Sequence, residues 1–148
     1  MAKRTILHVI RRLTNGGASR CMQAMARWSS REGAYEHRFL SLAPAGGGQR
    51  EAVERADVVV VHFWNTPELY AWLRSDLPSL RLLLVLHVGG LHAPQVVTRP
   101  LVDFADYVLA TSPFTLRLPV IDQAKTAAMF SPAGFERLAR LLDPRGRP

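Results

Sequence analysis

Two glycines that follow the first predicted strand could hold a phosphate group. Gly16 and Gly17 come after an apolar run at residues 5–10, and a helical pattern begins at Ala18. Glycine lets the backbone approach a ligand closely, and the first turn of a helix offers free N–H groups and a positive dipole end to an anion. The loop, which starts at Asn15, matches neither common nucleotide-binding fingerprint. These residues therefore fit either a phosphate-facing loop or a tight turn between strand and helix.

Two histidines stand at the ends of later predicted strands and could contact a sugar or a phosphate. His62 comes directly after a run of valines, and His87 ends the next apolar strand, just before Gly89. An imidazole at such a place can bond a sugar hydroxyl or a phosphate, or it can be a structural histidine bonded to a loop carbonyl. Trp64 and Asn65, close to His62, suit a sugar-binding lip, although Trp64 could instead pack on the next helix.

Ser112 follows the fifth predicted strand and has two interpretations. Its hydroxyl could contact a donor phosphate, or it could cap a helical turn in which Pro113 takes the first position. No metal site is predicted, because His87 and His92 lack a carboxylate or cysteine at ligand spacing. The sequence also lacks the G-x-S-x-G elbow of serine hydrolases.

The elements that would position these residues alternate along the chain. Strands are predicted at 5–10, 35–42, 57–61, 81–87, 107–110 and 125–130, and helices at 18–31, 51–55, 67–74 and 96–104. The segment 35–42 alternates, whereas strands such as 57–61 and 81–87 are apolar almost throughout. Strands that are apolar throughout and separated by helices indicate a parallel sheet covered on both faces. We therefore predict an α/β fold, a Rossmann-like open parallel sheet with helices on both faces, whose ligands bind at the carboxyl ends of the strands.

The helix predicted at 18–31 combines an apolar arc with an arginine ridge. The arc contains Ala18, Cys21, Met22, Ala24, Met25, Ala26 and Trp28, and the ridge contains Arg20, Gln23, Arg27 and Arg31. Because such an arc repeats at helical spacing, we expect it to pack on the sheet. The ridge is either a solvated face or a peripheral contact with anionic lipid.

Composition limits the partners and the compartment. The net charge of +7 favours anionic partners such as nucleotide phosphates, but basic and aromatic residues are not interleaved as in single-strand binders, so no nucleic-acid partner is predicted. The single cysteine, Cys21, excludes an internal disulfide and suits a reducing cytoplasm. Apolar stretches such as residues 82–86 are far shorter than the roughly 20 residues that span a bilayer. We expect a cytoplasmic protein, with peripheral attachment to the inner face of the membrane as an open alternative.

The order of these segments resembles family 4 glycosyltransferases, which are two-domain enzymes with the GT-B fold. That family commonly begins with a strand, a Gly-Gly-Ala-x-Arg turn and a helix, to which Gly16-Gly17-Ala18-Ser19-Arg20 is similar. Further similar segments are the helix end at 31–33, the strand at 56–62, the His-Gly turn within 84–90, the Ala-Asp…Ser segment at 104–112, and residues 133–138, where the family leaves its first domain. The resemblance covers nearly the whole chain.

The resemblance implies a retaining transfer of a hexose from a nucleotide-diphosphate sugar to an acceptor hydroxyl, without a cofactor or an obligatory metal. In that family the first domain mainly holds the acceptor, and the second mainly holds the donor nucleotide. Carried over to this sequence, Gly16 and Gly17 would face the donor phosphates, and the catalytic His87 would lie near the transferred sugar. We further expect Asn15, Gly89 and Ser112 on the donor side of the site, and His62, Trp64 and Asn65 on the acceptor side.

The resemblance also indicates that the second domain of such an enzyme is not contained in this sequence. We expect residues 1–142 to form the acceptor-side domain and residues 143–148 to be an interdomain linker or tail. The Glu-x7-Glu motif of the family's second domain is absent from the sequence. Because catalysis needs both reactants in one closed cleft, we expect the N-terminal half of a glycosyltransferase of carbohydrate biosynthesis, inactive alone and completed by a C-terminal domain in the same or another chain.

Two other functions remain alternatives. The first is a non-catalytic binding or scaffolding module of the same fold, which docks a partner enzyme and in one version does so at a membrane surface. The second is a receiver-like or flavodoxin-like domain, ranked last because receivers need an acidic cluster where this chain carries histidine and glycine. Self-association through an exposed apolar face also stays open.

Overall fold

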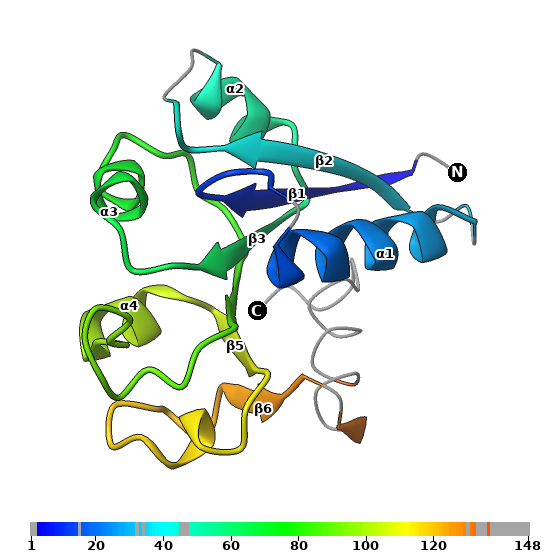
Figure 1. Ribbon diagram of the computed structural model, residues 1–148. Coiled ribbons are helices and arrows are strands. Elements are labelled where there is room, and N and C mark those ends of the chain that lie inside the picture. The colour runs from blue at the N-terminus through cyan, green and yellow to red at the C-terminus, as the bar shows by residue number, and fades with distance from the viewer. Residues whose placement is uncertain are drawn as a thin grey trace.

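A parallel sheet of six strands runs through the centre of the molecule (Figure 1). The structure is a computed structural model that describes residues 3–14, 16–31, 33, 35–44, 48–129, 131–132 and 136. The strands are β1 (Arg4–Ile10), β2 (Tyr35–Ser41), β3 (Val58–Phe63), β4 (Leu82–Leu86), β5 (Tyr107–Ala110) and β6 (Thr126–Ala128). They lie in the order β2-β1-β3-β4-β5-β6, and all neighbours are parallel, which confirms the predicted Rossmann-like sheet.

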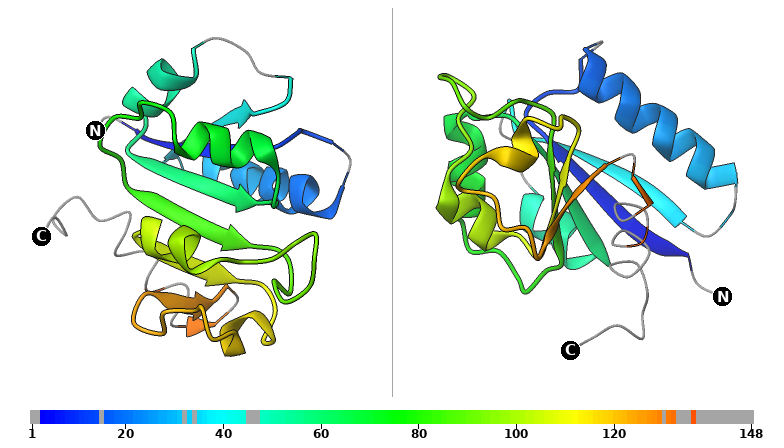
Figure 2. Two further views of the ribbon diagram at one scale, coloured as in Figure 1. Left: turned by 90° about the vertical axis from the view of Figure 1, so that its left-hand side faces the viewer. Right: turned by 90° about the horizontal axis from the view of Figure 1, so that it is seen from below.

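Helices cover both faces of this sheet (Figure 2). Of the helices that the structure describes, α1 (Gly17–Arg31) lies on one face, and α2 (Gln49–Glu54), α3 (Pro67–Leu73) and α4 (Arg99–Phe104) lie on the other. The cause is the strand order. The step from β1 to β2 runs in one direction along the sheet and the later steps run in the other, so right-handed crossovers place their helices on opposite faces.

Burial from both sides explains why the central strands are apolar along their length. β3 and β4 are buried throughout, and β1 is buried except at its first residue. Toward α2, α3 and α4, the side chains of Leu7, Val61 and Leu84 join a large apolar cluster that also contains Trp72. A smaller cluster on the α1 face contains Ile6, Val60 and Val85 together with other strand residues. The prediction of a doubly covered sheet is therefore confirmed.

The buried side of α1 is narrower than the predicted apolar arc. Met22 and Ala26 are buried as expected, together with Ser19. Trp28, in contrast, is 67% exposed, and Ala24 is also exposed, so their predicted packing on the sheet is wrong. The contact stripe follows spacings of three and four residues along one line of the helix, and the residues on the flanks of the arc do not reach the sheet.

Several elements also differ from their predicted ends, and α2, for example, begins at Gln49 instead of residue 51. β3 continues to Phe63 instead of ending at residue 61, so that His62 lies inside the strand and not after it. α4 begins at Arg99 rather than at residue 96, with Pro100 in its first turn, where proline is well tolerated. β6 is limited to Thr126–Ala128 within the longer predicted segment 125–130. The predicted linker at 143–148, most of the segment 133–138, and Asn15 lie outside the described residues.

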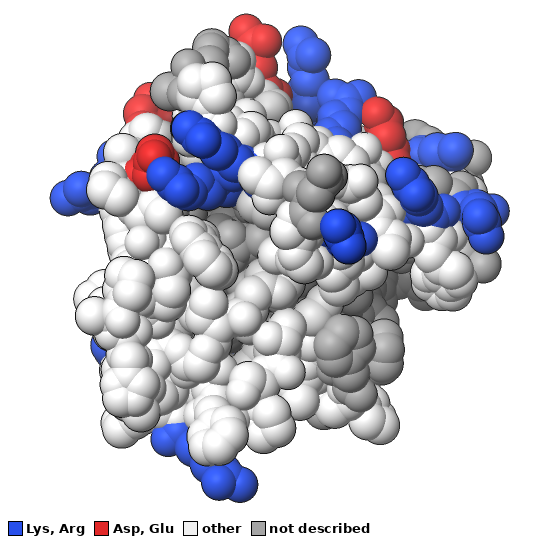
Figure 3. Space-filling view, in the orientation of Figure 1, with Lys and Arg blue, Asp and Glu red and all other residues white. Residues whose placement is uncertain are grey.

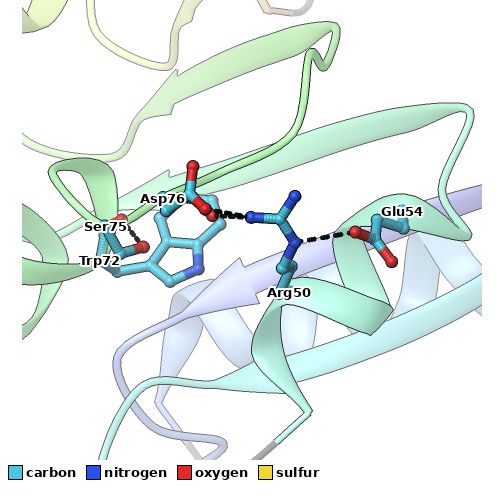
Figure 4. A network of polar contacts seen from close by, with 5 residues as sticks. All are labelled: Arg50, Glu54, Trp72, Ser75 and Asp76. Atoms are coloured by element: carbon cyan, nitrogen blue, oxygen red, sulfur yellow. Dashed lines mark hydrogen bonds and ion pairs between the residues drawn. The ribbon is translucent and has the colours of Figure 1, made fainter.

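A polar contact fastens α2 to the turn that follows α3 (Figure 4). The guanidinium of Arg50 donates to a carboxylate oxygen of Glu54 at 2.8 Å and also pairs with the Asp76 carboxylate. All three groups are well exposed, so water weakens these attractions, and such pairs contribute little to stability. The contact therefore orients α2, while the apolar cluster beneath it supplies the stability.

No helix within the described residues has the length and apolar character that crossing a bilayer would require.

Candidate functional site

A pocket of about 440 Å³ opens at the carboxyl edge of the sheet, where β1 lies beside β3. The chain leaves β1 toward β2 on one side, whereas β3 and the later strands lie on the other side, so this is the point where the strand order reverses. Open α/β sheets bind their ligands at such points. The pocket is lined by Ile10, Arg11, Arg12, Thr14, Gly16, Gly17, Ala18, Ser19, His62, Phe63, Trp64 and His87.

The N-terminus of α1 forms one wall of this pocket. The helix begins with the bond from the Arg20 N–H to the Gly16 carbonyl, 3.0 Å long. No residue that the structure describes accepts a hydrogen bond from the N–H groups of Gly17 or Ala18. An added Cβ at Gly17 would meet nothing within 4 Å, and one at Gly16 would meet only the Thr14 hydroxyl at 3.3 Å. Space is therefore open at both glycines, next to N–H groups that no described residue accepts from, and this arrangement suits an anion.

Two arginines add positive charge to the same pocket. Arg11 and Arg12 follow β1 directly, and both line the pocket. Arg11 has one acidic neighbour, with 3.5 Å between its Nη2 and Oε1 of Glu68, which is a long and weak contact. On the face shown in Figure 3, Lys and Arg side chains gather in the upper half, at the level of β1, β2 and α1, and the lower half carries little charge. The pocket thus combines helix N–H groups with guanidinium groups, both of which favour phosphate.

Four histidines on adjacent strands form a continuous hydrogen-bonded row, which we call the histidine row: His37 on β2, His8 on β1, His62 on β3 and His87 just after β4. His8 Nε2 lies 2.8 Å from His37 Nδ1, and His8 Nδ1 lies 3.0 Å from His62 Nε2. His62 Nδ1 lies 2.9 Å from His87 Nε2. Neighbouring ring planes are tilted by only 16° to 27°, and the nitrogens approach more closely than the ring centres, which are 5.1 to 5.3 Å apart. The rings therefore meet edge to edge.

Strand register creates this row. Each histidine is paired with the residue that lies two positions before the next histidine of the row. His37 is paired with Ile6, and His8 is paired with Val60. His62 is paired with Val85, two residues before His87. Two residues is the side-chain period of a strand, so all four rings point to the α1 face of the sheet. The row runs diagonally toward the carboxyl edge and ends in the pocket, which His87 lines.

The row is held in the neutral state. Burial lowers the pKa of His8 to about 3, helped by the neighbouring His37. Burial likewise lowers the pKa of His62 to about 2, with further contributions from His8 and His87. Burial also lowers the pKa of both end residues, His37 and His87. At neutral pH each ring therefore carries one N–H and one bare nitrogen.

The structure brings some of the predicted site residues together. Gly16, Gly17, His62, Trp64 and His87 all line the pocket, and Trp64 is 44% exposed. His62 is only 4% exposed, and both of its ring nitrogens are bonded to other histidines. A hydrogen bond from His62 to an acceptor hydroxyl would require the ring to release one of these partners. The predicted contact of Asn15 lies outside the described residues.

Three other predicted site residues do not line this pocket. Asn65 is tied to the loop after β4, because its side-chain amide donates to the Pro94 carbonyl and its backbone N–H donates to Gln95. Ser112 accepts a hydrogen bond from the Phe114 N–H at 3.3 Å, which fits its alternative interpretation as a turn cap. Gly89 is exposed and lies outside the pocket lining.

Sequence analysis missed His8 and His37 as parts of the site. A histidine in the middle of an otherwise apolar strand was a signal for His8, because a buried imidazole needs hydrogen-bond partners. The partners themselves depend on strand register, which the sequence alone does not define. No group of three or more potential ligands in the described part of the chain could hold a metal ion.

Comparison with known proteins shows the fold. No protein-family model and no curated protein matches the chain. Among solved structures, the chain is similar to an α-glucosyltransferase in complex with UDP and a 13-mer DNA containing a central A:G mismatch, with a TM-score of 0.56 and 15% sequence identity. The match covers 76% of this chain but only 38% of that enzyme. The chain therefore has the Rossmann-like α/β architecture of a GT-B glycosyltransferase domain and spans well under half of the enzyme that it resembles.

Proposed function

We propose that this chain is the acceptor-side domain of a retaining, family 4-like glycosyltransferase, which moves a hexose from a nucleotide-diphosphate sugar to an acceptor hydroxyl in the cytoplasm. One observation carries the proposal: helix N–H groups without an acceptor among the described residues, two arginines and His87 line a single pocket at the reversal point of the sheet. The fold similarity to a glucosyltransferase supports the same class of reaction. A second domain would close the cleft and hold most of the nucleotide.

Each wall of the pocket has a distinct task in this proposal. The N-terminus of α1 and the guanidinium groups of Arg11 and Arg12 stabilise the negative charge of the leaving diphosphate, which grows as the glycosidic bond breaks. His87 contacts the reacting groups from the end of β4. The exposed ring of Trp64 offers an apolar surface on which a sugar can pack, next to the catalytic pocket.

Substitution of Gly17 tests the phosphate site. With the chain completed by a second domain, Gly17→Val should weaken donor binding by about tenfold or more, because the new side chain occupies the space in front of the helix N–H groups. Thermal stability should change little, since a Cβ at this position meets no atom within 4 Å. His87→Ala should lower turnover by about a hundredfold at saturating donor. Donor titration and nucleotide-sugar turnover measure the two effects.

Ala24→Val is the matched control for Gly17→Val. It places the same side chain on an exposed position of the same helix, away from the pocket. It should leave donor affinity unchanged. If Gly17→Val binds donor and turns it over as well as this control does, the phosphate site is wrongly assigned.

A membrane-docking module is the second candidate, and the exposure of Trp28 favours it. This indole is 67% exposed on α1, between the exposed residues Arg27 and Arg31. An amphipathic ring beside cationic groups suits the interface of an anionic bilayer.

Vesicle co-sedimentation tests this candidate. Vesicles with anionic lipid should retain the protein at low salt and release it near 1 M salt, where the screening length falls to about 3 Å. Trp28→Ala should reduce retention at low salt, while Phe104→Ala, an exposed aromatic on α4, should not. Absence of binding to anionic vesicles at low salt would remove the membrane version of the candidate.

A further inference from the structure

The histidine row has a property that none of its members has alone. A neutral imidazole has one N–H and one bare nitrogen, and each of the three contacts in the row needs one proton between its two nitrogens. If His8 donates from Nε2 to His37, its Nδ1 is bare, so His62 must donate from Nε2, and His87 must then do the same. Only two arrangements therefore satisfy all three contacts: every ring is protonated on Nε2, or every ring is protonated on Nδ1.

The two arrangements present opposite groups to the pocket. His87 bonds His62 through Nε2, so Nδ1 is the nitrogen that the row leaves free at this end. When all rings are protonated on Nε2, His87 offers a bare nitrogen, which repels a phosphate oxygen. When all rings are protonated on Nδ1, His87 offers an N–H, which can donate to that oxygen.

The other end of the row shares a pocket with two arginines. His37 lines a second pocket together with Gln23, Arg27 and Arg31 of α1. Its Nε2 is buried and has no hydrogen-bond partner among the described residues. A positive charge favours a bare nitrogen lone pair over an N–H that points toward it. The environment of His37 therefore favours protonation on Nδ1, and the contacts of the row pass this preference to His87.

We propose that the histidine row is a tautomer relay, which keeps the proton of His87 on Nδ1 and so presents a hydrogen-bond donor to a phosphate in the carboxyl-edge pocket. His62, His8 and His37 are positioning residues in this arrangement, because they act on the phosphate only through His87. No proton crosses the sheet during binding; the row sets which nitrogen carries it. The proposal rests on the phosphate role of the pocket in the proposed function, but the coupling between the rings is independent of that role.

Nitrogen-15 NMR of the full chain at pH 7.5 tests the coupling without any ligand. Long-range proton–nitrogen spectra distinguish an N–H from a bare ring nitrogen, and the wild type should show the four rings of the row protonated on Nδ1. His92, which is outside the row, serves as an internal reference. Rings of the row with different tautomers would overturn the relay, and four rings all protonated on Nε2 would overturn the donor assignment of His87.

Substitution at the distant end tests whether the preference is transmitted. R27Q/R31Q removes the two cations that share a pocket with His37 and should shift all four rings together toward Nε2 protonation. Arg20→Gln removes one exposed charge from the same helix, outside the second pocket, and should leave the tautomers unchanged. A shift of His37 alone, with His87 unaffected, would contradict transmission through the row.

Binding of inorganic pyrophosphate then separates the relay from the proposed function. R27Q/R31Q should weaken pyrophosphate binding to the carboxyl-edge pocket by about threefold or more relative to Arg20→Gln, because His87 loses part of its N–H population. If pyrophosphate does not bind the wild type while the four rings change tautomer together in NMR, the phosphate role of the pocket fails and the relay survives. If pyrophosphate binds equally to both variants while the tautomers differ, the role of His87 as donor is overturned.

Discussion

Acidification from pH 6.5 to 4.5 should unfold this domain, because two buried histidines of the row bind protons only when it unfolds. His8 and His62 remain neutral in the fold, with pKa values lowered to about 3 and about 2, whereas each binds a proton near pH 6.5 once unfolded. The unfolded state thus holds about two more protons at pH 5 than the folded state does. Stability should therefore fall by roughly 2–3 kcal/mol for each pH unit.

The sign of this effect follows from the direction of the pKa shifts. A histidine whose pKa is lowered by folding contributes stability above the unfolded value, and that stability is lost as the pH falls from 6.5 toward the folded value. The charged groups at the two ends are Arg27 and Arg31, which share a pocket with His37, and Arg11 and Arg12, which line the pocket that contains His87. Over two pH units the loss is comparable to the whole stability of a small domain.

Urea unfolding at a series of pH values measures this slope. His8→Leu should lower stability at pH 8, because two neighbouring imidazoles lose a partner, yet it should make the acid slope shallower by about one proton. His92→Gln, outside the row, should leave both quantities unchanged. A wild-type stability that stays flat from pH 6.5 to 4.5 would show that the row is not held neutral in the fold.

Gly90→Ala should destabilise the domain by about 2–5 kcal/mol, whereas Gly89→Ala should have little effect. Gly90 has φ of +79°, and an added Cβ would lie 2.7 Å from Val97 Cγ2 and 2.9 Å from Leu118 Cδ1. Both neighbours belong to the buried apolar cluster, so they have little room to move. At Gly89 an added Cβ meets nothing within 4 Å, and no positive φ is present.

Thermal or urea unfolding of the two alanine variants measures the difference directly. Because the glycines are adjacent, the pair controls for general effects on the loop after β4. The comparison also bears on function, since Gly89 was the glycine predicted to contact the donor. Equal stabilities for the two variants would mean that the close packing around Gly90 is not present in solution.

The apolar pattern of the sequence was sufficient to predict the sheet, because unbroken apolar runs indicate buried central strands such as β3 and β4. The pattern did not predict which residues of α1 are buried. Trp28 belongs to the apolar arc by its helical spacing, but it is exposed and does not pack on the sheet. The breadth of an apolar arc does not reveal how wide its partner surface is. The end of β3 was misplaced for a related reason, since the polar His62 looked like the residue that terminates the strand.

The candidate site was only partly predictable from the sequence. The loop glycines and His87 stand at strand ends, and the rule that parallel sheets bind ligands at that edge was enough to group them. His8 and His37 could not be connected to His87, because their contacts depend on pairing between strands that are 25 to 54 residues apart in sequence. Asn65 and Ser112 stand at comparable places, but their side chains satisfy local backbone groups.

The diagonal offset of the histidines also bears on how the chain finds its correct pairing during folding. Val58 to Val61 are four valines in succession, and a run of identical side chains fits its neighbours almost equally well when shifted along them. A shift of one residue between β1 and β3 would turn His8 or His62 toward the apolar cluster of the opposite face, and a shift of two would separate their nitrogens. The imidazole contacts therefore distinguish the correct register of β3 from the shifted registers that its four valines alone would tolerate.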